Sequence, residues 1–472
     1  MARAKINRLR ELSDNIRIVR RKDGKPTQYW ETSQSPDMGK ISSSFIEMLD
    51  QGYKNMKQIL RSPFSSPEAI DRRQFQLVKE LITTSYENVA FYRGKYQNVG
   101  FQPGDLKSWA DYNNLPLTTK DELIEAFPDL CVNLSLTRDD FFATRSSGSS
   151  GRTLRIFVDP EAIVTDTLQG IRQFKLQSNG KYSKKHTIAH VYTVPWWIDS
   201  LKNNEYSSVF ISSLISPKDI GIILDDVRPQ ILSLYPSNLS SILPYISERT
   251  KKRLYLTVTH SEMSSEEERR TQSERLGCPV LDEYSSEELT RIVLELPCGH
   301  YHICEDTTRL DLIDPRSKTP IDEGTGLVVA TNLLNRAMPF IRYIQGDIIT
   351  IGKQDQCEVH WKQIEKVKGR ENDSFIRSDG VIIPSGTILD ISYRWMFDTN
   401  INIQEFEIVQ RDNKIIVNLT EPSLRSEEAL DKSRAHLRLL LESVMGADFE
   451  LDFNIVDKIE KLGIKRKAIR RE

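Results

Sequence analysis

The chain has 472 residues, of which 38% are hydrophobic and 28% are charged, and its formal net charge at pH 7 is -2. This composition is typical of a globular protein with more than one domain; it excludes a disordered chain and disfavours a general nucleic-acid binder. No apolar run approaches the length of a membrane span, no hydrophobic signal segment opens the chain, and five cysteines make no disulfide framework, so we expect a cytoplasmic protein.

Helical periodicity dominates the first part of the chain. Residues 41–96 repeat apolar positions at helical spacing, with breaks at Pro63 and Pro67. Farther along, Thr119 and Lys120 precede acidic residues, a pattern that predicts a helix start with threonine capping. These segments predict a helical region that comes before the strands.

Two predicted strands, at residues 140–144 and 154–159, flank a loop that is rich in serine and glycine. Glycines let a backbone close on a ligand, and amides, hydroxyl groups and a cation suit a polyphosphate, although a flexible surface loop would have the same composition. A P-loop NTPase is excluded because only two residues separate Gly148 from Gly151, arginine replaces lysine, and a strand follows. The candidate phosphate-binding residues are Ser146, Ser147, Gly148, Ser149, Ser150, Gly151 and Arg152.

Helices and strands then alternate, which predicts an α/β fold with layered helices and substantially parallel sheets. The expected helices span residues 160–177, 220–227 and 261–276, and the expected strands span 187–192, 231–234 and 280–284. Ligands in such sheets gather at the carboxyl ends of strands, so Tyr284 to Glu287 are well placed for a site. Tyr284 could stack on a base and Glu287 could reach a metal, whereas the alternative for Glu287 is the first turn of a following helix.

Residues 335–347, with the sequence Asn-Arg-Ala-Met-Pro-Phe-Ile-Arg-Tyr-Ile-Gln-Gly-Asp, resemble a segment of the phenylacetate–CoA ligase family of adenylate-forming enzymes. The serine-rich loop is similar to the phosphate loop of this family, although Arg152-Thr153 replaces its usual proline. Three other blocks keep the family's order, with Ser285 in place of glycine and Asn372 in place of the hinge aspartate. These blocks are Tyr284-Ser285-Ser286-Glu287, Val367-Lys368-Gly369-Arg370-Glu371-Asn372-Asp373 and Gly380-Val381-Ile382-Ile383-Pro384-Ser385.

The resemblance implies a nucleotide site built from these blocks. Asp347 would hold the ribose hydroxyl groups of ATP, and Arg370 would contact ribose and phosphate. Tyr284 would pack on adenine, Glu287 would bind Mg²⁺, and Ser286 would complete the set. The chemistry fits these roles, because a carboxylate accepts two ribose hydroxyl bonds well and a guanidinium fork suits phosphate.

Cysteine and histidine gather at two places, with four of them at residues 298–304 and two more at residues 357–360. Two such clusters are typical of a tetrahedral zinc site, and several relatives in the family resembled have Cys/His clusters at these places. Four protein ligands would make the site structural, whereas solvated histidines with buried free thiols are the other interpretation. The predicted ligands are Cys298, His302, Cys357 and His360, with His300 and Cys304 as alternatives.

The composition changes beyond Asp373, where a hairpin at 406–417, a helix at 426–445 and a strand at 449–455 predict a small α+β domain. We expect a large layered α/β N-terminal domain at residues 1–371 and a small mobile C-terminal domain at 372–472. The basic tail of this domain is typical of a solvated end or a weak nucleic-acid patch. The resemblance points instead to Lys465 as the catalytic lysine that meets the substrate carboxylate and the α-phosphate, with Lys461 as the alternative.

The resemblance implies an AMP-forming ligase that converts a small-molecule carboxylate and Mg-ATP into an acyl-adenylate, then transfers the acyl group, most simply to coenzyme A. Transfer to an amine or hydroxyl, or donation of AMP itself, shares the first half-reaction and stays open. A zinc-stabilised binding protein without catalysis is the hypothesis from another class. Neither a nucleic-acid nor a membrane partner is expected, and the chain would be a monomer or a homodimer.

Trp196 and Trp197 could line an apolar substrate pocket, although core packing explains tandem tryptophans more often.

Overall fold

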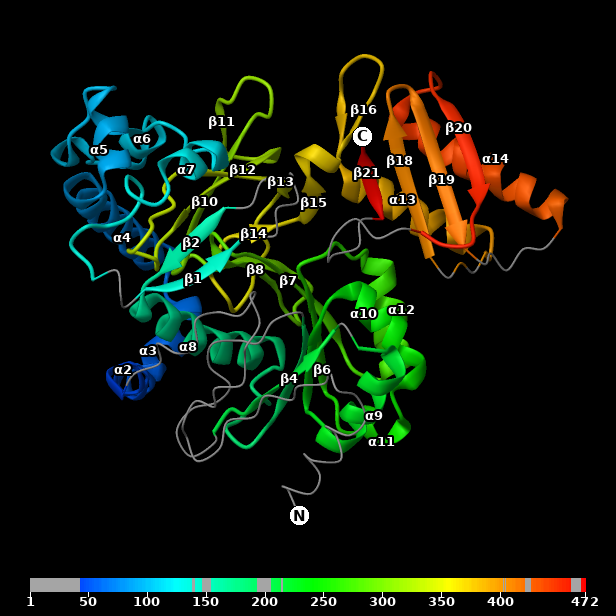
Figure 1. Cartoon of the computed structure of the whole chain (residues 1–472), viewed down its shortest axis with the longest axis horizontal. Coiled ribbons are helices and arrows are strands. Elements are labelled where there is room, and N and C mark those ends of the chain that lie inside the picture. Colours follow the sequence, from blue (N-terminus) through cyan, green and yellow to red (C-terminus); the bar gives the residue numbers. More distant parts are fainter. Residues whose placement is uncertain are drawn as a thin grey trace.

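The computed structural model describes residues 43–137, 141–146, 154–192, 205–213, 215–401, 403, 405–420, 426–459 and 468–472. Figure 1 shows N-terminal helices on the left, sheets in the centre, and a C-terminal group of strands and helices at the upper right. None of the helices in the described ranges is both long and apolar enough to cross a membrane.

The N-terminal helices break where the sequence predicted. Ser66 caps α4 (Pro67–Asn88) through its side chain, immediately after the short η2 helix (Ser62–Phe64) that contains the first proline. The hydroxyl of Tyr92 ties this region to the centre, because it donates to the Pro339 carbonyl at 2.9 Å and accepts from the Ile341 amide at 3.0 Å. The other helices of this region are α2 (Ser43–Lys54), α3 (Met56–Arg61), α5 (Ala90–Gln97), η3 (Pro103–Asp105), α6 (Trp109–Asn113) and α7 (Lys120–Ala126).

The largest sheet has eight strands. They are β3 (Ile188–Tyr192), β4 (Ser208–Ser212), β5 (Ile231–Leu234), β6 (Leu256–His260), β7 (Val280–Ser286), β8 (Thr290–Glu295), β9 (Tyr301–Ile303) and β14 (Gln363–Ile364). Their order is β14-β9-β8-β7-β6-β5-β3-β4. Neighbours from β4 to β7 pair in parallel, whereas those from β7 to β14 pair antiparallel, so the predicted parallel arrangement holds for only part of this sheet.

Helices cover both faces of this sheet. Ile188 belongs to a core cluster with residues of α8 (Pro160–Gln177), and the next strand residue, Ala189, belongs to a cluster with residues of α9 (Pro217–Val227). Successive strand residues point to opposite faces, so a sheet that is buried on both faces carries continuous apolar runs. The other helices of this layer are α10 (Pro236–Ile242), η6 (Leu243–Tyr245), α11 (Glu248–Lys251) and α12 (Glu266–Leu276).

A second sheet has five strands, all antiparallel, in the order β11-β10-β12-β13-β15. They are β10 (Thr308–Ile313), β11 (Pro320–Ile321), β12 (Gly324–Asn332), β13 (Tyr343–Ile351) and β15 (Lys366–Arg370). The prediction of parallel sheets is wrong for this part of the chain. Parallel strands need a long crossover connection, and the short links between β10, β11 and β12 allow only antiparallel pairing.

A hairpin carries the serine-rich loop. Its strands are β1 (Phe142–Arg145) and β2 (Arg155–Val158), which pair antiparallel with Phe142 opposite Val158. The predicted strand-to-strand crossing is therefore confirmed, although residues 147–153 of the loop itself lie outside the described residues.

The C-terminal part builds its own core around a four-stranded sheet in the order β20-β19-β18-β21. Trp395 is fully buried there, and its indole nitrogen donates to the carbonyl of Ser433 at 2.8 Å, which joins the two long helices. A small α+β unit thus follows the layered α/β part, and the predicted fold class is confirmed. The elements are η7 (Glu371–Asp373), β16 (Phe375–Ile376), β17 (Ile382–Ile383), α13 (Ser385–Asp398), β18 (Glu405–Arg411), β19 (Lys414–Thr420), α14 (Glu427–Met445), β20 (Glu450–Ile455) and β21 (Ile469–Arg471).

Candidate functional site

Asp347 and Arg370 form an ion pair between two neighbouring strands. Antiparallel pairing of β13 with β15 sets the two residues directly opposite each other, and Arg370 Nε lies 2.8 Å from Asp347 Oδ1. The Asp347 side chain is 7% exposed and that of Arg370 is 38% exposed, so the guanidinium keeps an open side. The nearby carboxylate of Asp347 raises the pKa of Arg370. The sheet register therefore produces a fixed, charged pair with one face available to a ligand.

Tyr284 connects this pair to the eight-stranded sheet. It lies on β7, and its hydroxyl donates to Asp347 Oδ2 at 2.7 Å. Burial raises the pKa of Tyr284, and the charge of Asp347 adds to the effect, so the phenol stays a hydrogen-bond donor. Three predicted site residues from three distant segments, Tyr284, Asp347 and Arg370, thus meet at one point between the two sheets.

Glu287 lies at the carboxyl end of β7, beside the hairpin that carries the serine-rich loop. Its Oε2 accepts a hydrogen bond from Thr144 Oγ1 at 2.9 Å, and its side chain is exposed. A turn into β8 follows it, so the alternative of a first helical turn is wrong. Ser286 lies one residue earlier, and its hydroxyl oxygen accepts from the Leu289 amide within this turn.

Ser146 closes the base of the serine-rich loop. Its amide donates to the Leu154 carbonyl at 2.9 Å, and its hydroxyl oxygen accepts from the Leu154 amide at 3.0 Å. Ser146 is buried, and both of these hydrogen bonds are with the backbone of Leu154 at the other end of the loop. The other predicted phosphate-loop residues, Ser147, Gly148, Ser149, Ser150, Gly151 and Arg152, lie outside the described residues, as do Lys461, Lys465, Trp196 and Trp197.

A cluster of aromatic rings at the carboxyl ends of β3, β5 and β6 escaped the sequence analysis. Tyr192, Tyr235 and His260 have ring centroids 4.9 to 5.8 Å apart. Burial raises the pKa of Tyr192 to about 12, and the charge of Glu287 contributes. His260 pairs with Glu283 of β7, the strand that carries Tyr284. The general rule that ligands bind at the carboxyl ends of parallel strands could have identified these positions once the strands were assigned.

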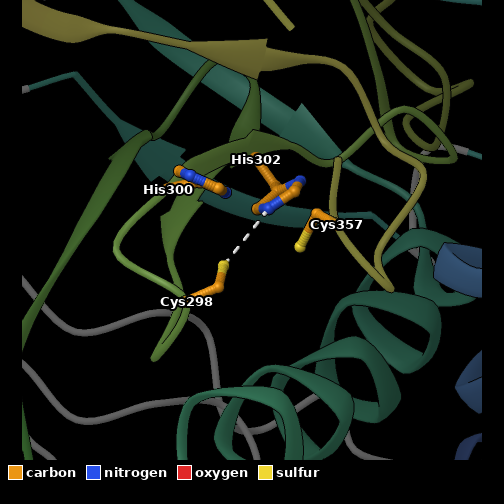
Figure 2. Close-up of side chains that lie close together, drawn as sticks. All are labelled: Cys298, His300, His302 and Cys357. Atoms are coloured by element: carbon orange, nitrogen blue, oxygen red, sulfur yellow. Dashed lines mark hydrogen bonds between the residues drawn. The ribbon is translucent and has the colours of Figure 1, made fainter. Parts of the chain in front are cut away.

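Four side chains of the types that can bind a metal ion gather at the edge of the eight-stranded sheet. Figure 2 shows Cys298, His300, His302 and Cys357 close together, and one ligand atom of each lies within 4.8 Å of all the others. Cys298 belongs to the turn between β8 and β9, and Cys357 belongs to the segment before β14. The Cys298 sulfur lies 3.6 Å from His302 Nε2, while His302 Nδ1 contacts the carbonyl of Trp361 at 3.0 Å.

The cluster differs from the predicted ligand set in one residue. His360 lies outside it, because its amide donates to Pro63 and its Nδ1 donates to the Ser65 carbonyl at 2.8 Å, which holds the ring against η2. His300, first given only as an alternative, takes its place. The other alternative, Cys304, is buried in an apolar core where burial raises its pKa to about 12.

The donor set suits a tetrahedral metal ion. Among the described residues, the buried Nδ1 of His300 has no hydrogen-bond partner, whereas its Nε2 lies 3.7 Å from a carboxylate oxygen of Asp355. One free ring nitrogen and a carboxylate on the other nitrogen are typical of a histidine metal ligand. Burial lowers the pKa of His302, which favours the neutral ring that a metal needs.

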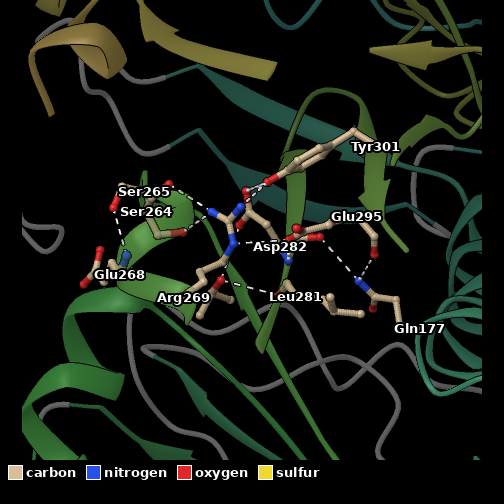
Figure 3. Close-up of polar contacts among 10 residues, drawn as sticks. Gln177, Ser264, Ser265, Glu268, Arg269, Leu281, Asp282, Glu295 and Tyr301 are labelled. Atoms are coloured by element: carbon tan, nitrogen blue, oxygen red, sulfur yellow. Dashed lines mark hydrogen bonds and ion pairs between the residues drawn. The ribbon is translucent and has the colours of Figure 1, made fainter. Parts of the chain in front are cut away.

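A buried ionic network underlies the strand that carries Tyr284. In Figure 3, Arg269 of α12 reaches the sheet, where its Nε lies 3.2 Å from Glu295 Oε2 and its terminal nitrogen donates to the Tyr301 hydroxyl at 2.7 Å. The same Glu295 oxygen accepts from the Asp282 amide at 2.7 Å. Burial raises the pKa of Asp282 to about 6. The positive charge of Arg269 lowers this pKa, and the negative charge of Glu295 adds to the rise.

No protein-family model matches the chain. In sequence, the chain is similar to phenylacetate-coenzyme A ligase from Pseudomonas putida, at 22% identity over 342 residues that cover 69% of this chain and 76% of the ligase. It is also similar to phenylacetate-coenzyme A ligase from Escherichia coli (strain K12), at 23% identity over 337 residues that cover 68% and 76% of the two chains.

Crystal structures of 2-hydroxyisobutyryl-CoA ligase have a similar fold. The postadenylation state of that ligase matches with a TM-score of 0.72 at 16% identity, covering 87% of this chain and 91% of that chain. Its thioesterification state matches with a TM-score of 0.58 at 17% identity, covering 87% and 92%. The chain thus has the fold of this adenylate-forming CoA ligase. In sequence it is similar to the phenylacetate–coenzyme A ligases, as its motifs predicted.

The pKa of Asp282 predicts a pH-dependent stability. The folded protein binds this proton more tightly than the unfolded chain, so the stabilisation is present below the ordinary pKa near 4 and is lost as the pH rises through about 6. Asp282→Asn should therefore be more stable than the wild type at pH 7 by about 2–3 kcal/mol, and equally stable near pH 4. Urea unfolding at both pH values measures the difference.

Asp379 provides a matched control. Its pKa is lowered to about 2, first by the hydrogen bond with Arg377, so Asp379→Asn should give no gain of stability at pH 7. An Asp282→Asn variant with the wild-type pH profile would show that this carboxylate does not titrate as described.

Proposed function

We propose that the protein activates a carboxylic acid with ATP as an acyl-adenylate and transfers the acyl group to coenzyme A. The observation that carries this proposal is the meeting of Tyr284, Asp347 and Arg370 at one point between the sheets. The similarity to phenylacetate-coenzyme A ligases supports coenzyme A as the acceptor of the acyl group. The retained charged pair argues against the alternative of a binding protein without catalysis.

Asp347 and Arg370 would hold the ribose end of the nucleotide. Among the described residues, each carboxylate oxygen of Asp347 has one partner, and a carboxylate oxygen has a second lone pair that can accept a ribose hydroxyl. The open side of Arg370 would contact ribose and the α-phosphate, and the Tyr284 ring would lie against adenine. The ion pair holds both groups in position before the nucleotide arrives, which lowers the entropy cost of binding.

Glu287 fits a magnesium ligand. Mg²⁺ binds through one or two carboxylates together with substrate phosphates and water, and Glu287 is an exposed carboxylate beside the base of the proposed phosphate loop. When bound, the ion would neutralise charge on the phosphates. Ser146 would hold the two ends of the loop together, and residues 147–152 would surround the phosphates.

The reaction would take two steps. A carboxylate oxygen of the substrate attacks the α-phosphorus of ATP and pyrophosphate leaves; the coenzyme A sulfur, after losing its proton, then attacks the acyl carbonyl carbon and AMP leaves. Positioning and charge neutralisation carry both steps, so no side-chain nucleophile is required. Tyr192, Tyr235 and His260 would line the acyl end of the site, because they lie at the carboxyl ends of parallel strands near Glu287.

Residues 372–472 would form a mobile domain that brings Lys465 to the substrate carboxylate and the α-phosphate. Two observations support this division: these residues have their own sheet and core, and η7, which contains Asn372, separates them from β15. The higher TM-score with the postadenylation state supports a postadenylation-like arrangement of the chain.

Cys298, His300, His302 and Cys357 would bind a structural zinc ion. Four protein ligands leave no open position for a substrate, so the ion would fasten the β8–β9 turn to the segment before β14. That segment continues into β15, which carries Arg370. All five cysteines are free thiols, which fits the proposed cytoplasmic location.

Asp347→Ala tests the nucleotide site. Loss of a charge-assisted contact worth about 1.5–3 kcal/mol should weaken ATP binding by roughly 10- to 100-fold. Calorimetric ATP binding and carboxylate-dependent exchange of labelled pyrophosphate into ATP, across a library of acids, give the two measurements. Asp311→Ala breaks a comparable carboxylate–arginine pair in the same sheet and should leave ATP affinity unchanged. Unchanged ATP affinity in the Asp347 variant would contradict the ribose assignment.

Elemental analysis tests the metal site. We expect about one zinc per chain after purification without added metal, and a clear loss of zinc in Cys298→Ser and His300→Ala. His360→Ala should retain the metal, because the structure holds this ring outside the cluster. Metal-free protein in which Cys298 and Cys357 titrate as ordinary thiols would refute the site.

Lys465→Ala tests the mobile domain. The loss of a cation that stabilises developing charge should slow pyrophosphate exchange by roughly 100- to 1000-fold. Acyl transfer from a chemically supplied acyl-adenylate should stay near the wild-type rate, because the second step would use another domain position. Equal losses in both half-reactions would assign Lys465 a role in folding, and a loss only in Lys461→Ala would move the assignment.

A further inference from the structure

We propose that Met263 is a positioning residue that docks the C-terminal unit, residues 372–472, onto the rest of the chain for the first half-reaction. This inference rests on the proposed function and adds to it a contact that joins the two parts. Met263 lies in the loop between β6 and α12, yet it packs against the hydrophobic core of the C-terminal unit. Among the described apolar residues, it is the only one before position 372 that packs against this core.

The side chain of Met263 ends where three segments lie in close contact. Gly369 of β15 has a φ of +96°, and a Cβ atom there would lie 2.5 Å from Met263 Sδ and closer still to Ser385 Oγ. Ser385 begins α13, and its Oγ lies 4.0 Å from Met263 Sδ. Gly369 immediately precedes Arg370, so this docking contact adjoins a residue of the proposed nucleotide site.

The first turn of α13 approaches the same strand through a second glycine. A Cβ atom on Gly386 would lie 2.7 Å from the carbonyl oxygen of Lys368, which is a backbone atom and cannot rotate away as a side chain could. Nonbonded carbon atoms prefer separations of about 3.5–4.0 Å, so a side chain at this position would push α13 away from β15. The close packing of α13 on β15 therefore requires glycine at position 386.

The loop that carries Met263 is fixed by the large part of the chain. Arg269 of the buried ionic network donates to the carbonyl and to the hydroxyl oxygen of Ser264, both at 3.0 Å (Figure 3). The next residue, Ser265, caps α12 by accepting a hydrogen bond from the Glu268 amide. Met263 is thus held in position by contacts that do not involve the C-terminal unit, which lowers the entropy cost of docking.

The polar contacts across this junction are exposed and therefore contribute less. Lys366 pairs with Asp390, but their side chains are 32% and 36% exposed, and exposed ion pairs add little stability. Arg316 donates to the Gly380 carbonyl at the surface. Ile382 of β17 packs against the apolar cluster of the five-stranded sheet and is a second apolar contact between the two parts. Of these two apolar contacts, the one made by Met263 adjoins Arg370.

Gly386→Ala in the full-length protein tests the docking contact without weakening α13, because alanine is a better helix former than glycine. Carboxylate-dependent pyrophosphate exchange should fall by roughly 10-fold or more, since the docked arrangement would be less populated. Acyl transfer from a chemically supplied acyl-adenylate should keep the wild-type rate, because that step would use another position of the unit. Met263→Ala should have the same two effects, whereas Met263→Leu has a similar volume and should keep exchange near the wild-type rate.

Gly94→Ala is the matched control. Gly94 lies within α5, and a Cβ atom there would meet no other described segment within 4 Å, so this variant should exchange pyrophosphate as the wild type does. Small-angle X-ray scattering gives a measurement that is independent of activity. The radius of gyration should increase in Gly386→Ala and Met263→Ala, because the C-terminal unit would leave its docked position. It should stay at the wild-type value in Met263→Leu and Gly94→Ala.

The other outcomes separate this inference from the proposed function. Equal losses in both half-reactions would show that Met263 supports folding, and a loss confined to acyl transfer would assign the docked arrangement to the second half-reaction; either result would overturn the proposal. An unchanged radius of gyration in both Gly386→Ala and Met263→Ala would also overturn it. If the wild type exchanges pyrophosphate with no acid, the proposed function fails, and the scattering comparison still decides whether Met263 docks the C-terminal unit.

Discussion

The structure depends on one buried carboxylate, Asp347, and on the partners that neutralise it. A carboxylate removed from water is costly unless it is paired and hydrogen-bonded. Here Arg370 supplies the charge from the neighbouring strand, and Tyr284 supplies a hydrogen bond from the other sheet. The same contacts therefore satisfy the charge and fix the relative position of the two sheets. A ligand that contacts Arg370 therefore meets a side chain whose position the ion pair with Asp347 already fixes.

A second set of polar contacts joins the β1–β2 hairpin to the eight-stranded sheet at the carboxyl end of β7. Thr144 bonds Glu287, and Ser146 pairs with Leu154 through two hydrogen bonds, so both ends of the serine-rich loop are held beside the carboxyl end of β7. The fold thereby brings a loop suited to phosphate and an exposed carboxylate to the same place.

Two clusters support these strands from the outer part of the sheet. Arg269 ties α12 to β8 and β9, and Asp282 joins this network two residues before Tyr284. Cys298, His300, His302 and Cys357 gather beyond the network, where the segment leading to β14 and β15 passes the β8–β9 turn. A metal at that place would hold together two segments that few backbone hydrogen bonds join.

The sequence alone determined the class of fold, the order of the motifs and most of the helices and strands, because periodicity, capping and motif composition are local properties of the chain. It also identified Asp347, Arg370 and Tyr284 as candidates through their motifs. Only the tertiary structure decided that these three touch, since cross-strand register and the approach of two sheets depend on distant segments. The choice of His300 over His360 was likewise tertiary, because hydrogen bonds with η2 hold the second ring elsewhere. The partial failure of the parallel-sheet prediction has the same cause: strand direction follows from which segments pair, and composition does not encode it.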